Sequence, residues 1–243
     1  MLIGMSAADD HWPFERRTGA FIWHSDFSLD SYKSLLAEMG DLQQDLIRQL
    51  GVGECNEPVY LFVFQDKSTY QAYLKRYFPK VPYRRALFIK ERGPGMVFAY
   101  RSPDLEIDIR HESTHALLHS CLPMVPLWLD EGLAEYFEIP APQRPSQNPH
   151  LSSLKWQVRL GQIARMEALE ATNSLSQMGR NEYRDSFAWV HFMLHGPQEA
   201  REELQRFLAD IHAHTPPGKL SDRLRRRIPD LDRQFSNHLK EWQ

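Results

Sequence analysis

The chain has 243 residues and a formal net charge of −3, with 42% hydrophobic and 25% charged residues. These values are typical of a globular protein with a proper core, and they do not favour a nucleic-acid-binding surface. No apolar run approaches the roughly 18 residues that a membrane helix needs, so we expect no membrane span. The start lacks a basic region and a long apolar stretch, which predicts a cytoplasmic protein, or an exported one if the N-terminus is truncated.

The first half of the chain alternates strand-like and helix-like patterns. Residues 1–17 are expected to be an irregular tail. A Gly-Pro-Gly turn predicts a hairpin, and Gly51 is expected to end a long amphipathic helix. Cys55 and Cys121 are expected to be reduced thiols, because two cysteines do not make a disulfide framework. The predicted strands are 18–23, 59–64, 85–89 and 96–100, and the predicted helices are 28–50 and 67–78.

The second half of the chain is predicted to be almost entirely helical. A proline-rich stretch at 140–149 interrupts it as a loop or linker. Together the two halves predict an α+β protein, in which a small mixed sheet with helices forms an N-terminal lobe and helices form a C-terminal lobe. The lobes are expected at about 18–122 and 123–243, within one domain. The predicted helices are about 127–138, 152–171, 183–195, 198–213 and 230–241.

The stretch that carries chemistry is His111-Glu112-Ser113-Thr114-His115. Residues four apart share one face of a helix, so His111 and His115 can hold one zinc ion between them. Glu112 lies one position round the helix, where a general base for a zinc-activated water belongs.

A zinc enzyme with two histidines needs a third protein ligand. A metzincin would have Gly at position 118 and His at 121, but this chain has Leu118 and Cys121. His119 lies two turns from His111, about 12 Å along the axis, and is too far to share the ion. The predicted helix after Pro126 offers Glu131 instead. Other carboxylates of the same helix remain alternatives.

Metal-bound histidines usually donate their outer ring N–H to a carboxylate or carbonyl. Glu135 lies one turn after Glu131 on the same face of its predicted helix, so it is a candidate partner for a ligand histidine. Asp130 competes for the same role. Either residue would also be the next choice as third ligand if Glu131 were not one.

The pattern His-Glu-x-x-His followed by Trp-Leu-Asp-Glu-Gly-Leu-Ala at 128–134 resembles the gluzincin zinc metallopeptidases, and most closely their short peptidase MA-like members. The resemblance is strongest over 108–138 and implies a catalytic domain over 18–243. It implies a zincin-like active-site helix that binds one Zn²⁺ per chain through His111, His115 and Glu131. It also implies a hydrolase with Glu112 as the base and a peptide or protein as substrate.

Two further expectations rest on the same resemblance. Zinc aminopeptidases place a catalytic tyrosine where Tyr183 opens a later helix here. In gluzincins the strand before the active-site helix is the edge of the sheet, which implies that Val97, Phe98 and Ala99 bind substrate. The edge-strand motifs of the large families are absent, so their substrate preferences do not carry over.

Besides a hydrolase of non-peptide substrates, two alternatives to a peptidase remain. One is a catalytically silent zinc protein of this fold that binds a peptide or a partner. The other is a chance His-Glu-x-x-His in a helical structural protein, which would leave Glu131 without a role. The sequence does not indicate an oligomeric state.

Overall fold

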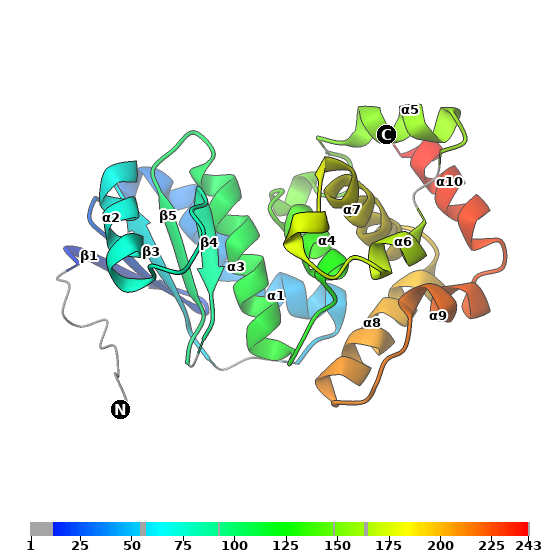
Figure 1. Cartoon of the computed structure of the whole chain (residues 1–243), viewed down its shortest axis with the longest axis horizontal. Helices are drawn as coiled ribbons and strands as arrows, with labels where there is room; N and C mark the ends of the chain where they lie inside the picture. Colours follow the sequence, from blue (N-terminus) through cyan, green and yellow to red (C-terminus); the bar gives the residue numbers. More distant parts are fainter. Residues whose placement is uncertain (1–11, 54–56, 92, 148, 163–164, 243) are drawn as a thin grey trace.

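A computed structural model describes residues 12–53, 57–91, 93–147, 149–162 and 165–242. The predicted α+β class is confirmed, with a five-stranded mixed sheet and helices between and after its strands. The sheet lies at one end of the molecule and most of the later helices lie at the other (Figure 1). The strands are β1 (Phe14–Thr18), β2 (Phe21–Ser25), β3 (Val59–Phe64), β4 (Ala86–Ile89) and β5 (Met96–Tyr100).

The strand order in the sheet is β1-β2-β3-β5-β4. The three central strands run parallel, while β1 and β4 pair antiparallel at the two edges. β4 and β5 form the predicted hairpin, in which Ala86 lies opposite Ala99. The prediction that β5 is the edge strand is wrong, because β5 is paired on both sides and β4 is the edge.

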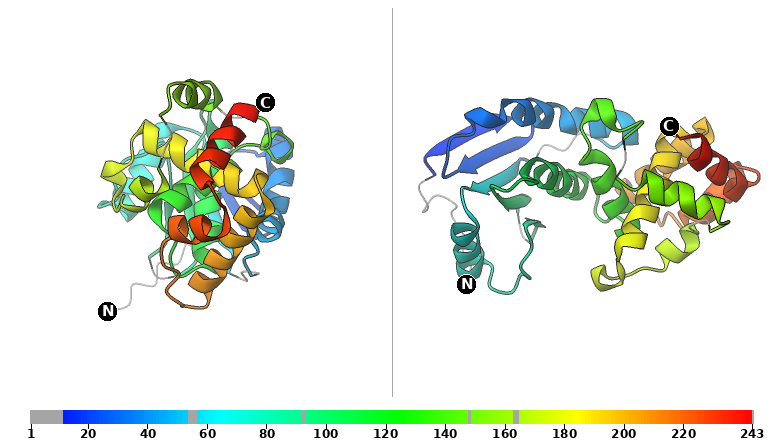
Figure 2. Two further views of the ribbon diagram at one scale, coloured as in Figure 1. Left: turned by 90° about the vertical axis from the view of Figure 1, so that its right-hand side faces the viewer. Right: turned by 90° about the horizontal axis from the view of Figure 1, so that it is seen from above.

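The alternation of side chains along β3 and β5 divides the sheet into two packed faces. Phe62 and Phe98 stack at 5.0 Å on one face, which is covered by α2 (Lys67–Tyr77). Leu61 and Val97 point to the other face, which is covered by α1 (Lys33–Leu50) and α3 (Leu105–Cys121). The view from above shows α1 and α2 on opposite sides of the sheet (Figure 2).

One hydrophobic core runs from the α1/α3 face of the sheet into the helices of the C-terminal half. Within the described part of the chain, no helix combines the length and the apolarity needed to cross a membrane. The helices of the C-terminal half are α4 (Leu127–Phe137), α5 (Leu151–Arg159), α6 (Met166–Glu170), α7 (Arg180–His195), α8 (Gln198–His212), α9 (Leu220–Arg227) and α10 (Leu231–Glu241).

Several local predictions differ from the structure. Residues 14–17 belong to strand β1 and are not irregular, while residues 1–11 of the expected tail lie outside the described residues. The helix expected over 152–171 is two helices, α5 and α6. Cys121 is disulfide-bonded, so the prediction of a reduced thiol is wrong for it, and Cys55 lies outside the described residues.

The proline-rich stretch after α4 is held against the protein. The buried Arg144 donates from Nε to the carbonyl of Ile139 and pairs with Asp45 of α1. The carbonyl of Pro145 accepts a 2.9 Å hydrogen bond from Nε1 of Trp242, near the end of the described chain. This stretch is therefore a packed loop that ties α4 to α1 and to the C-terminal helix.

Candidate metal centre

Helix α3, which carries both histidines, is held in place at its N-terminal end by Arg85. The guanidinium of Arg85 donates from Nε and NH2 to the two carboxylate oxygens of Asp108, at 2.6 and 2.7 Å. It also pairs with Asp104, the residue before α3. Such forked pairs fix both distance and orientation, so α3 is locked to the start of β4.

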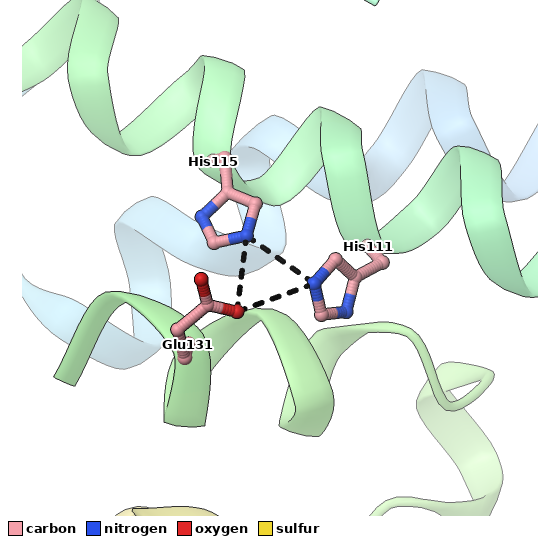
Figure 3. Close-up of side chains that lie close together, drawn as sticks. All are labelled: His111, His115 and Glu131. Carbon is pink, nitrogen blue, oxygen red and sulfur yellow. Dashed lines mark hydrogen bonds and ion pairs between the residues drawn. The ribbon is translucent and has the colours of Figure 1, made fainter. Parts of the chain in front are cut away.

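The two histidines of α3 and Glu131 of α4 meet at one point. The two Nε2 atoms of His111 and His115 lie 3.2 Å apart, and Oε2 of Glu131 lies 3.6 and 3.7 Å from them. Figure 3 shows both rings pointing from α3 toward the carboxylate of Glu131 on α4. A circle through these three atoms has a radius of about 2.0 Å, which is the length of a zinc–nitrogen bond.

Carboxylates hold the outer nitrogens of both rings. Nδ1 of His111 lies 2.8 Å from Oε2 of Glu138, and Nδ1 of His115 lies 2.9 Å from Oδ1 of Asp130. A carboxylate favours a proton on the nitrogen beside it, and in a neutral imidazole this leaves the lone pair on Nε2. Two lone pairs and a carboxylate oxygen then converge, an arrangement that fits a bound cation.

The electrostatics of the cluster also favour positive charge at this point. Burial by itself would lower the pKa of His115, but Asp130 and Glu131 outweigh it and raise that pKa to about 9. Burial would raise the pKa of Glu131, yet the two histidines lower it to about 2. The donor set of two imidazoles and one carboxylate is one that zinc accepts, so the residues present fit a zinc ion.

The charge of Glu112 acts on His111, and the charge of Glu131 acts on the hydroxyl of Tyr183. Tyr183 lies in the first turn of α7, which begins at Arg180 and not at the predicted residue 183, and it is half-buried. Burial and then the charge of Glu131 raise the pKa of its hydroxyl to about 12, with smaller contributions from Glu135 and Glu112. The structure therefore brings Tyr183 within electrostatic range of the predicted ligand and of the predicted base, with its hydroxyl proton retained.

Close packing of α4 against α7 brings the first turns of α7 near Glu131. A Cβ built at Gly132 would lie 2.8 Å from the carbonyl oxygen of Ser186. Only a glycine allows this approach, because real Cβ contacts are essentially never shorter than 3.0 Å. Gly132 follows Glu131 directly, and Ser186 lies about one turn after Tyr183.

Of the predicted outer partners, Asp130 lies 2.9 Å from Nδ1 of His115, while the carboxylate oxygen beside Nδ1 of His111 belongs to Glu138 and not to Glu135. Glu135 pairs instead with Nε2 of His150 at 3.2 Å. The partner of His111 is Glu138, which was not predicted for this role. The spacing could have indicated it, because Glu138 lies about two helical turns after Glu131 and therefore on nearly the same side of the helix.

His119 is a second residue that the sequence did not reveal. It is too far along α3 to share the ion, as expected, but its Nε2 lies 2.9 Å from Oδ2 of Asp130. The ring of Phe88 in β4 stacks against it at 5.8 Å. Asp130 therefore lies between His115 and His119, with one carboxylate oxygen beside each ring. His119 thereby fixes the carboxylate that orients His115.

The predicted substrate-binding residues do not line the cluster. Val97, Phe98 and Ala99 are each 0% exposed and lie in β5, between β3 and β4. Their backbone groups face other strands and their side chains face the two cores. Within the described part of the sheet, the free edge on this side belongs to β4, at Ala86–Ile89.

Neither a comparison with models of known protein families nor a search of curated proteins finds a match to this chain. The case for a function therefore rests on the residues and their geometry.

Proposed function

We propose that the protein is a zinc-dependent metallopeptidase of the gluzincin type. The observation that carries this proposal is the convergence of Nε2 of His111, Nε2 of His115 and Oε2 of Glu131, at separations of 3.2 to 3.7 Å. The resemblance of residues 108–138 to the gluzincin motifs supports it independently. One Zn²⁺ per chain is the expected cofactor.

A zinc ion held by these three residues would supply a Lewis acid and lower the pKa of a water molecule to about 7. Glu112 would accept the proton of that water during attack on the peptide carbonyl and then return it to the leaving amine. The hydroxyl of Tyr183, protonated because its pKa is raised to about 12, would donate a hydrogen bond to the developing oxyanion. Each residue therefore has one role that its position allows.

The substrate strand of the proposed enzyme is β4 and not β5. β4 is antiparallel to β5 and its outer side is unpaired within the described sheet. It packs beside α3, as the stacking of Phe88 on His119 indicates. An extended peptide could add to this edge through main-chain hydrogen bonds.

The decisive experiment compares the parent with Glu112→Gln after loading both with zinc. The glutamine keeps the size of the side chain but removes the base, and Glu112 is not one of the three converging ligands. We expect equal zinc content in both proteins and cleavage of a mixed peptide library by the parent alone. A parent that holds zinc and cleaves no peptide would favour the alternative, a silent protein that binds peptides or a partner.

A further inference from the structure

The segment that leads into β4 presents a cation without a carboxylate partner among the described residues. Arg84 is exposed, and no carboxylate in the described part of the chain forms an ion pair with its guanidinium. Its neighbour Arg85 differs, since its guanidinium forms an ion pair with Asp108. The adjacent Tyr83 is also unusually open for an aromatic residue, with 49% of its surface exposed.

The backbone of Arg84 is nevertheless fixed. The fully buried Tyr70 donates a 2.8 Å hydrogen bond from its hydroxyl to the carbonyl of Arg84. The next residue, Arg85, is itself anchored to the first turn of α3 through its 2.6 and 2.7 Å hydrogen bonds to Asp108. The protein backbone is therefore fixed on both sides of the Arg84 side chain. A ligand that binds the Arg84 guanidinium would consequently lose little free energy to the ordering of this backbone.

Arg84 lies near the N-terminal end of the helix that carries the predicted base, because its neighbour Arg85 binds Asp108, about one helical turn before Glu112. Burial and Glu131 raise the pKa of Tyr183, and the positive charge of Arg84 opposes them. The charge of Arg84 therefore acts on the same hydroxyl as the charges of Glu131, Glu135 and Glu112. Tyr70, whose hydroxyl binds the carbonyl of Arg84, likewise feels the charge of Glu112.

We propose that Arg84 binds a carboxylate of the peptide substrate. The proposal rests on the peptidase function and names a substrate feature for it. Carboxylates crowd the metal centre, so an anionic substrate would be repelled there unless a cation received it. An arginine binds a carboxylate through two parallel N–H···O bonds, and Arg84 is the unpaired cation next to the start of β4 at Ala86.

The carboxylate can be the C-terminus of the substrate or the side chain of an acidic residue. Three fluorescently labelled peptides of one core sequence separate these sources: one with a free C-terminus and no acidic residue, one amidated with a single glutamate, and one amidated without any carboxylate. Binding is measured by anisotropy to zinc-loaded Glu112→Gln protein, so that no turnover is required.

Adding Arg84→Ala to this background should weaken binding of one or both carboxylate-bearing peptides by about 10- to 100-fold, the range for a charge-assisted pair. Binding of the peptide without a carboxylate should not change, and Arg84→Lys should recover part of the loss. The control is Arg16→Ala, an exposed arginine on β1 at the opposite edge of the sheet, which should have no effect.

Equal affinities for all three peptides before and after Arg84→Ala would overturn the proposal while leaving the peptidase intact. An equal loss for all three peptides would also overturn it, because the effect would then not depend on a carboxylate. Binding of none of the peptides, together with no cleavage by the parent, would contradict both the peptidase function and the role of Arg84.

Discussion

Gly132 and Ser186 lie in backbone contact across the α4–α7 interface, since a Cβ at Gly132 would be 2.8 Å from the carbonyl oxygen of Ser186. This contact couples two parts of the site. Glu131 precedes Gly132 on α4, and Tyr183 lies about one turn before Ser186 on α7. The spacing of the two helices therefore sets the distance between the predicted third ligand and the predicted oxyanion donor.

Gly132→Ala should force α4 and α7 apart, because the added methyl meets backbone and not a flexible side chain. We expect a loss of stability of about 1–3 kcal/mol, typical of overpacking, and a lower kcat with most of the zinc retained. Chemical denaturation and steady-state kinetics measure the two effects. Gly40→Ala in α1 is the matched control, since a Cβ there meets nothing within 4 Å. Equal behaviour of the two variants would contradict the close contact.

Tyr183→Phe should leave the fold and the zinc content unchanged, because the hydroxyl is not among the converging ligand atoms. If that hydroxyl donates to the oxyanion, kcat should fall by about 100- to 1000-fold with little change in KM. Peptide-cleavage kinetics at saturating zinc make the measurement. A kcat within about twofold of the parent would reduce Tyr183 to a packing residue.

Asp130→Ala and Glu138→Ala should each weaken zinc binding by about 10- to 100-fold, because each removes the carboxylate beside the outer nitrogen of a histidine that we propose as a ligand. Competition with a zinc-binding dye gives the affinities. Glu135→Ala is the control, since its carboxylate pairs with His150 and not with a ligand. An effect of Glu135→Ala as large as that of Glu138→Ala would mean that the assignment of the two glutamates is wrong.

The sequence predicted the parts of the site that depend on local spacing. Two histidines four residues apart must lie on the same face of a helix. Glu131 could be chosen as the third ligand because it lies in the short motif at 128–134 that resembles the gluzincins. The edge strand was not predictable in this way, because a hairpin signal shows that β4 and β5 pair but not which of them meets β3. That choice is made by tertiary packing, and it buries Val97, Phe98 and Ala99. Arg84 lies in a loop without periodicity, so no pattern marked it.

The helical half should lose stability in mild acid. Nε2 of His191 faces the carbonyl of Pro145 at 3.2 Å and must carry the proton, so its Nδ1 accepts from Nε2 of His238 at 2.9 Å. Burial and neighbouring histidines lower the pKa of His191 to about 3 and that of His238 to about 4.

Both values lie below the unfolded value of 6.5, so the unfolded chain binds more protons and stability falls as the pH drops from about 6.5 toward 4. Urea denaturation at pH 7.5, 6 and 5 measures this slope. His238→Gln keeps a donor for His191 but cannot titrate, so its stability should depend less on pH over this range. A slope identical to that of the parent would mean that other groups control acid unfolding.

The most direct test of the central claim is the zinc content of chelator-free protein after reconstitution, measured by elemental analysis for the parent, Glu131→Ala and Glu135→Ala. The convergence of His111, His115 and Glu131 predicts about one zinc per chain in the parent and in Glu135→Ala, and little in Glu131→Ala. A parent that binds no zinc would contradict the metal centre and the peptidase function together. Full zinc binding by Glu131→Ala would show that the third ligand is a different residue.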